Sequence, residues 1–267
     1  MTDAAAPLID VKGLEAWYGK RRILHDVDFR VDAGEIRVIM GGSGSGKSTL
    51  LRQILGLHRP TRGSIRLFGT DIVNAGQREL QQVRRRLGVS FQGGALLTSL
   101  SVGDNVALPL REHTKLDENQ IRIMSRMKLE VVNLGGFHDL MPSQLSGGMV
   151  KRAALARAIV MDPRLLFFDE PSAGLDPVVS AELDELILRL RDALRMTIVV
   201  VTHELDSAFK IADTITVLDQ GSVLMTDTVD AVRRSDNERI QDLLNRRPRD
   251  VVVDADAYLR RLTEEEV

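Results

Sequence analysis

The sequence of 267 residues predicts an α/β fold, in which a parallel sheet is accompanied by an antiparallel β layer and interrupted by an inserted helical subdomain. Two continuous apolar runs, Leu165–Phe168 and Thr197–Val201, are typical of parallel strands buried on both faces. Ile23–Val31 instead alternates polar and apolar residues, which is typical of a sheet with one covered face. A helix-rich stretch, residues 93–161, separates the first strands from the later ones.

The remaining elements follow in chain order from the same patterns. Two more strands of the antiparallel layer are expected at Leu8–Val11 and Ile65–Phe68. Gln220 and Gly221 form a two-residue turn that predicts a hairpin between Thr214–Leu218 and Val223–Met225. Helices are expected in three segments: Leu116–Val132, Val150–Val160 and Ser180–Leu194.

These elements divide the chain into three parts. Residues 1–92 and 162–235 form the expected catalytic core, and residues 93–161 form the helical subdomain. Residues 236–267 are expected to be a C-terminal tail that acts as an interaction element. Ile240, Leu243 and Leu244 share one face of a short helix there. Because such a helix is marginal alone, the stripe should pack on the same protomer, on a second protomer or on a partner protein.

Composition narrows the class of protein. The chain is 43% hydrophobic and 28% charged with a formal net charge of -2, which suits a compact protein and argues against a nucleic-acid partner. It has no cysteine, which excludes disulfides and thiolate metal ligands. Its N-terminus lacks the basic and apolar regions of a signal peptide, and its apolar runs are too short to cross a bilayer. We therefore expect a cytoplasmic location.

The most informative motif is a phosphate-binding loop that fits G-x-x-x-x-G-K-[ST]. A strand, Glu35–Met40, precedes it and a helix, Leu50–Leu55, follows it, so backbone N–H groups and a helix N-terminus should face the phosphates. Lys47 should reach the β- and γ-phosphates and face solvent without them, and Ser48 should ligate Mg²⁺. The alternative is a flexible Gly/Ser turn. The loop comprises Gly41, Gly42, Ser43, Gly44, Ser45, Gly46, Lys47, Ser48 and Thr49.

Two acids end the apolar strand Leu165–Phe168. In a protein with a phosphate loop, Asp169 is expected to hold the Mg²⁺ shell. Glu170 lies just beyond the strand and is expected to polarise an attacking water. The competing interpretation is a strand capped by solvated acids.

A second anion site is expected where Ser146, Gly147 and Gly148 open a helix. The alternative is an ordinary helix N-cap with glycines easing the turn. A single phosphate loop already contacts the β- and γ-phosphates, so a second cradle needs a phosphate from elsewhere. A nucleotide held by another copy of the chain, in a head-to-tail dimer, supplies it.

Two further polar residues follow strands. His203 comes after the strand Thr197–Val201, close to where the two acids should emerge, and could contact the γ-phosphate. Gln92 follows Val89–Phe91, and its amide could ligate Mg²⁺ and sense water. Neither residue would carry weight alone.

Taken together, these residues resemble the ATPase subunits of ABC transporters. The order and approximate spacing of the phosphate loop, Gln92, Leu145–Met149, Asp169-Glu170, Ala173–Asp176 and His203 agree with that family. The resemblance implies a P-loop NTPase (RecA-like) core that binds ATP and Mg²⁺. It also implies that Tyr18 stacks on adenine, that Asp176 belongs to a loop at the dimer interface and that His203 is a switch residue.

One residue departs from the usual motif of the family, and this departure resembles one subgroup of the ABC ATPases. The signature motif usually ends in Gln, whereas Met149 stands here, and Phe91–Thr98, Asn105–Thr114 and Met141–Leu145 resemble the Mla-type ATPases that work with MCE proteins. The resemblance implies a homodimer that assembles with a membrane permease, an MCE substrate-binding protein and a small STAS-domain subunit at the cytoplasmic face of the inner membrane, peripheral through the permease. It implies phospholipid transport between inner and outer membranes. The permease is expected to dock near Leu96 and Leu97.

Other functions are open at this point. Related MCE-linked importers of sterols or other lipids share the local motifs. A soluble ABC-type mechanochemical ATPase usually carries two fused halves or a long coiled coil, whereas this chain has one motif set. A small-molecule P-loop kinase would leave Ser146–Gly148 and His203 without a task.

Overall fold

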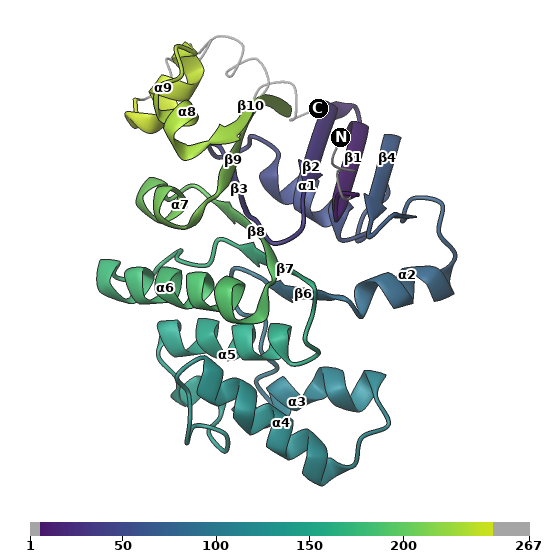
Figure 1. Ribbon diagram of the computed structural model, residues 1–267, viewed down its shortest axis with the longest axis vertical. Coiled ribbons are helices and arrows are strands. Elements are labelled where there is room, and N and C mark those ends of the chain that lie inside the picture. The colour runs from purple at the N-terminus through teal and green to yellow at the C-terminus, as the bar shows by residue number, and fades with distance from the viewer. Residues whose placement is uncertain (1–5, 248–267) are drawn as a thin grey trace, which may run out of the picture.

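Two β-sheets organise the molecule, which the computed structural model describes for residues 6–247 (Figure 1). The larger sheet comprises β3 (Ile36–Met40), β6 (Leu87–Ser90), β7 (Leu165–Asp169), β8 (Thr197–Thr202), β9 (Thr214–Asp219) and β10 (Ser222–Thr228). Its order is β10-β9-β3-β8-β7-β6. Only the β9–β10 pair is antiparallel among these neighbours, so five strands place their carboxyl ends at one edge. The predicted parallel strands and the hairpin are confirmed.

The smaller sheet is antiparallel, as the alternating pattern predicts. It comprises β1 (Ile9–Tyr18), β2 (Arg21–Val31), β4 (Arg62–Leu67) and β5 (Thr70–Asp71), in the order β2-β1-β4-β5. The predicted first strand ends too early, at Val11, because register shifts between Val11 and Trp17 interrupt the alternation while the strand continues to Tyr18. The two sheets meet through a common apolar layer.

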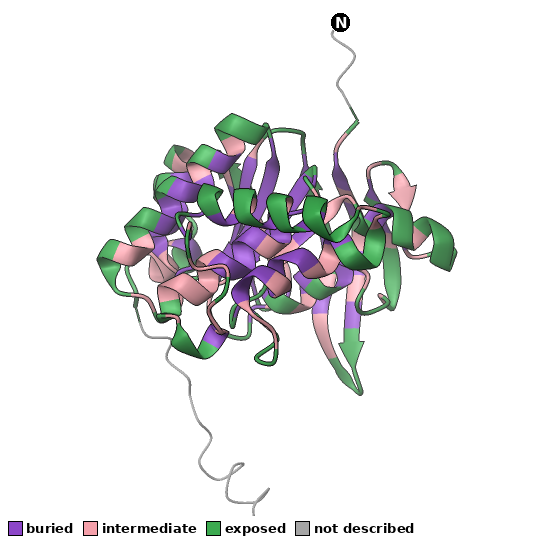
Figure 2. Ribbon diagram, turned by 90° about the horizontal axis from the view of Figure 1, so that it is seen from below, coloured by how far each residue is buried: buried purple, intermediate pink, exposed green. Residues whose placement is uncertain are grey.

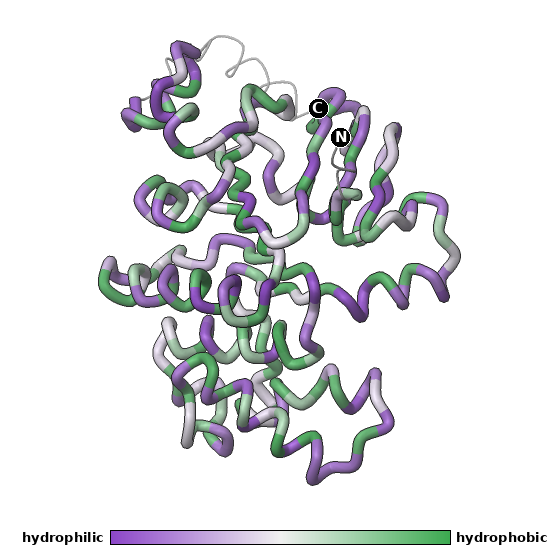
Figure 3. The backbone as a smooth tube through the Cα atoms, in the orientation of Figure 1, coloured by the Kyte–Doolittle hydropathy of each residue, from purple (hydrophilic) through white to green (hydrophobic). Residues whose placement is uncertain are grey.

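Alternate residues of β8 show why its apolar run is continuous. Ile198 and Val200 pack into a core that also contains helices, whereas Val199 and Val201 pack into the core shared with the antiparallel sheet. All four side chains are fully buried. Figure 2 shows the buried residues on the strands and inner helix faces, and Figure 3 shows the hydrophobic residues gathered there.

Helices cover both faces of the larger sheet. Those outside the region 93–161 are α1 (Lys47–Ile54), α2 (Gln77–Arg84), α6 (Pro177–Leu194), α7 (Leu205–Ile211), α8 (Val229–Arg233) and α9 (Glu238–Leu244). The predicted helix at Ser180–Leu194 is confirmed as α6, which begins three residues earlier because Asp176 caps it.

The region 93–161 folds into helices that lie together below the sheet in Figure 1. They are α3 (Val102–His113), α4 (Glu118–Val131), the 3-10 helix η1 (Pro142–Gln144) and α5 (Gly147–Ile159). The predicted helices at Leu116–Val132 and Val150–Val160 are confirmed as α4 and α5. Val106, Leu129 and Leu155 from these helices share one hydrophobic core with Phe168 of β7, which connects the helices to the sheet.

The C-terminal stripe packs on its own chain. Ile240 of α9 is 1% exposed and belongs to the main core, and Leu243 and Leu244 pack against it. Of the three surfaces considered for this stripe, the same protomer is therefore the one that covers it. The rest of the expected tail, residues 248–267, lies outside the described residues.

Candidate active site

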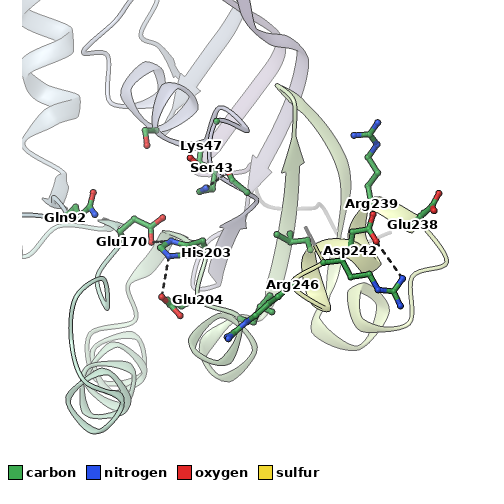
Figure 4. Close-up of a pocket in the computed structure, with 16 residues that line it drawn as sticks. Ser43, Lys47, Gln92, Glu170, His203, Glu204, Glu238, Arg239, Asp242 and Arg246 are labelled. Atoms are coloured by element: carbon green, nitrogen blue, oxygen red, sulfur yellow. Dashed lines mark hydrogen bonds and ion pairs between the residues drawn. The ribbon is translucent and has the colours of Figure 1, made fainter. Parts of the chain in front are cut away.

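A cleft of about 990 Å³ lies beside the carboxyl ends of β3, β6, β7 and β8 (Figure 4). One wall carries Lys47, Gln92, Glu170 and His203, which the sequence analysis selected. α9 supplies residues to the facing wall. The lining residues are Gly42, Ser43, Gly44, Lys47, Ser48, Gln92, Glu170, His203, Glu204, Leu205, Glu238, Arg239, Asp242, Leu243, Arg246 and Arg247.

Two glycines give the phosphate loop its path from β3 into α1. A Cβ on Gly41 would lie 2.1 Å from the Leu218 carbonyl oxygen, so no side chain fits there. Gly46 adopts φ 104°, a left-handed conformation that glycine reaches without strain. α1 begins directly after it, at Lys47, so the first N–H groups of the helix face the loop. The strand–loop–helix order predicted from the sequence is therefore confirmed.

Lys47 corrects one expectation. It does not face solvent: the residue is 8% exposed, and its Nζ donates hydrogen bonds to the carbonyl oxygens of Gly41 at 2.7 Å and Gly42 at 3.0 Å. Burial lowers the pKa of Lys47, while the charges of Glu170 and Asp169 raise it. The ammonium of Lys47 thus forms its hydrogen bonds with the phosphate loop itself. It would have to give up these two bonds to reach a phosphate.

The two acids after β7 have different environments. Burial raises the pKa of Asp169, and the charge of Glu170 raises it further, against the opposing effects of Arg52 and Lys47. Glu170 turns the chain out of the strand with φ 50°, and its N–H donates to the Val201 carbonyl at 2.8 Å. The turn aims its carboxylate into the cleft, where Figure 4 shows it beside His203.

His203 is hydrogen-bonded to that carboxylate. Its Nδ1 lies 2.8 Å from Glu170 Oε2, and its Nε2 lies 3.4 Å from Glu204 Oε1. The His203 side chain is half-exposed, whereas that of Glu170 is mostly buried. The pair therefore presents an oriented carboxylate to anything bound on the phosphate loop.

The donors expected for Mg²⁺ fit that ion chemically. Ser48 offers a hydroxyl, Gln92 an amide oxygen and Asp169 a carboxylate, and Mg²⁺ prefers oxygen ligands. Ser48 and Gln92 line the cleft, and Asp169 is close enough to Lys47 for their charges to interact. Within residues 6–247, no group of three or more His, Cys, Asp or Glu side chains is placed to hold a metal. Any divalent ion here would therefore depend on mixed oxygen donors.

The signature residues lie apart from this cleft. Ser146 caps α5, where its Oγ accepts a hydrogen bond from the Met149 N–H at 3.3 Å. Gly148 lies so close to α6 that a Cβ would be 2.7 Å from Val179 Cγ1. Among the described lining residues, none comes from Ser146–Gly148. The signature motif therefore does not line the cleft of its own protomer.

Two other expected residues also stand outside the cleft. Asp176 caps α6, since its carboxylate accepts hydrogen bonds from the N–H groups of Val178 at 3.0 Å and Val179 at 3.1 Å. Tyr18 ends β1 with its side chain half-exposed, and its ring meets the His58 ring edge-on at a centroid distance of 6.2 Å. His58 is itself exposed.

Sequence reasoning missed the wall that α9 and the residues directly after it contribute. Arg239, Arg246 and Arg247 line the cleft, and Arg239 pairs with Asp219 at 3.2 Å near the end of β9. The cluster of arginines 239–247 is visible in the sequence, but its position beside the phosphate loop depends on long-range packing. In the described part of the chain, no helix is long and apolar enough to cross a membrane.

Comparison with known proteins agrees with this arrangement. The ABC transporter family model matches residues 24–173. The chain is 46% identical to a Haemophilus influenzae protein named the intermembrane phospholipid transport system ATP-binding protein MlaF, over 89% of this chain and 90% of that protein. It is 44% identical to a Mycobacterium leprae protein named a probable ribonucleotide transport ATP-binding protein, mkl, over 90% of this chain and 69% of that protein.

Solved structures show the same fold. A dimeric ATP-binding cassette, MJ0796, solved with ADP and phosphate, aligns with a TM-score of 0.76 and 30% identity over 83% of this chain and 98% of that chain. CbiO1 from Clostridium perfringens aligns with a TM-score of 0.79 and 28% identity over 91% of this chain and 96% of that chain. The family model covers more than half of the chain, and the cleft has the phosphate loop at its centre. The chain therefore belongs to the ABC transporter family and is an ATP-binding, ATP-hydrolysing subunit.

Proposed function

We propose that this chain drives a transporter that moves phospholipid between the inner and outer membranes. The observation that carries the ATPase part is the cleft itself, in which the phosphate loop faces the hydrogen-bonded pair of Glu170 and His203. The cargo rests on similarity: proteins named MlaF from Haemophilus influenzae and Escherichia coli are 46% and 41% identical to this chain over about nine-tenths of it. Met149 of the signature motif belongs to the same resemblance.

The roles proposed for the residues follow from their placement. Lys47 exchanges its two loop carbonyls for the β- and γ-phosphate oxygens of ATP. Glu170 accepts a proton from a water, whose oxygen forms a bond to the γ-phosphorus while the bond from that phosphorus to the β,γ-bridging oxygen breaks. His203 holds the Glu170 carboxylate, with Nδ1 donating to it. Ser48, Gln92 and Asp169 would hold Mg²⁺, which supplies positive charge against the phosphate oxygens.

A second copy completes the site in this proposal. Ser146, Gly147 and Gly148 contact the ATP bound by the opposite protomer, and Asp176 lies at that interface, while Tyr18 stacks on the adenine of its own nucleotide. Support comes from the position of the signature motif outside its own cleft and from the similarity to a cassette solved as a dimer. The membrane permease, MCE protein and STAS-domain subunit are the further partners we propose, with the ATPase peripheral to the inner membrane through the permease.

A second cargo has specific support. The mkl protein, named for ribonucleotide transport, is almost as similar to this chain as the MlaF proteins are. A lipid other than a phospholipid, such as a sterol, is also compatible with the MCE-linked resemblance. The ATPase residues do not discriminate between these cargoes, because they contact only the nucleotide.

The test is purification of the chain from a detergent extract with its membrane subunits, followed by reconstitution in liposomes. We expect a polytopic permease to co-purify and ATP to drive transfer of a labelled phospholipid, with no transfer by the Glu170→Gln complex. Labelled sterol and ribonucleotide serve as competing cargoes under the same conditions. ATP-dependent movement of either one without phospholipid would overturn the assignment of cargo, and purification without any membrane subunit would overturn the assignment as a transporter ATPase.

A further inference from the structure

Lys151 holds the backbone of the catalytic turn. It lies in α5, and its Nζ donates hydrogen bonds to three carbonyl oxygens, those of Glu170 at 3.3 Å, Pro171 at 2.7 Å and Ala173 at 2.6 Å. A lysine ammonium has three N–H donors and no acceptor, so these three carbonyls use all of its hydrogen-bonding capacity. The side chain is half-buried. The ammonium of Lys151 therefore forms its hydrogen bonds with the turn.

The turn needs such support because of its conformation. Glu170 has φ 50°, a left-handed conformation that non-glycine residues adopt only where the surroundings impose it. From the strand side, the Glu170 N–H is held by the Val201 carbonyl at 2.8 Å. From the side of α5, the ammonium of Lys151 donates hydrogen bonds to the three carbonyl oxygens of the turn. The two attachments fix the direction in which the Glu170 carboxylate leaves the chain.

The same helix begins with the signature motif. Ser146 caps α5, and Lys151 lies about one turn further along it. Gly148 packs closely on Val179 of α6, whose N-cap is Asp176. α5 therefore touches the turn that works on its own ATP and carries the residues that face the ATP of the opposite protomer. A lysine between them joins the two parts of the site within one chain.

We propose that Lys151 is a positioning residue for ATP hydrolysis, which fixes the Glu170 turn and makes it move together with the signature end of α5. The proposal rests on the proposed role of Glu170 as the proton acceptor. Lys151 does not itself line the cleft: its hydrogen bonds go to the backbone of Glu170–Ala173, and its charge also interacts with that of Glu170. Its effect on hydrolysis therefore passes through the Glu170 turn. Binding of ATP to the phosphate loop does not depend on it.

The test compares three variants within the assembled complex. Lys151→Met keeps most of the length of the unbranched side chain and removes all three donors, whereas Lys151→Arg keeps the charge and the donors. We expect Lys151→Met to lower kcat by about 10–100-fold, the size of effect expected when a reacting group is misplaced by about 1 Å. KM for ATP should stay within about twofold, since the phosphate contacts persist. Lys151→Arg should regain most of the lost kcat.

Arg152→Met is the matched control, because Arg152 is the next cation of α5 and pairs with Glu182 of α6, and neither residue lines the cleft. It should lower the melting temperature and leave kcat within about twofold of wild type. A Lys151→Met variant whose kcat stays within about twofold of wild type would overturn the proposal. The proposal would also be overturned if Lys151→Met, Lys151→Arg and Arg152→Met all lost the same amount of kcat and the same amount of melting temperature. If Lys151→Met does not fold, Lys151→Gln, which keeps two donors, makes the same comparison.

A double variant separates this proposal from the role of Glu170. If Lys151 acts through Glu170, adding Lys151→Met to Glu170→Gln should not reduce the residual turnover further. A further loss of about tenfold would overturn the proposed pathway and place Lys151 in another step. Turnover at the wild-type rate by Glu170→Gln alone would instead reject Glu170 as the proton acceptor, which is a failure of the proposed function.

Discussion

His203 Nδ1 lies 2.8 Å from Glu170 Oε2, although the two residues are 33 positions apart in the chain. β7 and β8 are parallel neighbours, with Asp169 opposite Val201, so the residues that follow them emerge side by side. The side chain of Glu170 is 13% exposed and that of His203 is 54% exposed. The carboxylate therefore points inward while the imidazole covers it from the solvent side.

Replacing Glu170 by Gln should stop hydrolysis and trap an ATP-bound dimer. The amide keeps the size of the side chain but cannot accept a proton from water, so we expect kcat to fall by about 10²–10⁴-fold. The phosphate loop and the opposite signature motif remain intact, so closure around two ATP molecules should persist. Phosphate release measures the first effect, and cross-linking within the full complex measures the second.

Glu112→Gln serves as the control, because Glu112 is an exposed carboxylate of α3. It should change neither quantity. Wild-type turnover by Glu170→Gln would show that Glu170 is not the base. Loss of turnover without accumulation of the closed state would retain the base and reject the shared-site dimer.

Lys47→Ala should abolish turnover and also destabilise the protein. The structure adds the second effect, because Lys47 bonds two loop carbonyls instead of facing solvent. Loss of these charge-assisted hydrogen bonds should lower the free energy of unfolding by about 1–3 kcal/mol. Relief of the burial that lowers the pKa of Lys47 offsets part of this loss. Phosphate release and urea denaturation measure the two losses. Lys115→Ala, an exposed lysine, should leave both unchanged; an equally stable Lys47→Ala protein would mean that the two bonds are replaced by water.

Asp169→Asn should raise the stability of the nucleotide-free protein while abolishing turnover. Burial, followed by the charge of Glu170, raises the pKa of Asp169, so the folded state binds a proton more readily than the unfolded state does. Stability from this group is greatest below its usual pKa and falls as pH rises through the raised one. At neutral pH the ionised carboxylate thus opposes folding, and neutral Asn removes that opposition.

Melting temperatures between about pH 5 and pH 8 check the sign. The advantage of Asp169→Asn should shrink as the pH falls, because the raised pKa of Asp169 makes the wild-type carboxylate easier to protonate in the folded protein. Added Mg²⁺ and ATP should reverse the order, because the carboxylate is then a ligand and the wild type gains more from binding. A variant that is less stable than wild type at every pH would show that the ionised carboxylate is well compensated in the folded protein.

The fold was predictable where local pattern and burial coincide. The runs Leu165–Phe168 and Ile198–Val201 are apolar at every position because both faces of β7 and β8 are covered. The hairpin at Gln220-Gly221 needs two left-handed residues in sequence. Chemical motifs then located Glu170 and His203, because strands that are parallel neighbours bring their following residues together.

The rest depended on contacts between distant segments. The direction of Lys47 is decided by carbonyls of its own loop, which a motif does not specify. The attachment of Lys151 to the Glu170 turn joins two elements whose packing is not encoded locally. The sequence of α9 predicts only a short amphipathic helix. The burial of Ile240 in the main core shows which surface covers its apolar face.

The structure separates two neighbouring leucines that the sequence treats alike. Leu97 is 47% exposed, whereas Leu96 packs against the main core. Asn105 holds this loop, since its side-chain oxygen accepts from the Leu97 N–H at 2.7 Å and its amide donates to the Leu97 carbonyl at 3.0 Å. Leu97 is thus displayed on a fixed backbone, which suits contact with the permease.

Leu97→Ala should therefore lower the stimulation of turnover by the assembled complex and change the free energy of unfolding by less than about 0.5 kcal/mol. Leu96→Ala should instead lower that free energy by about 1–3 kcal/mol, because it removes partly buried apolar surface. Turnover per site, compared between the isolated chain and the complex in lipid, measures stimulation, and urea denaturation of the isolated chain measures stability. Equal stimulation in Leu97→Ala and wild type would place the permease contact elsewhere, and a marked loss of stability in Leu97→Ala would identify that residue as core.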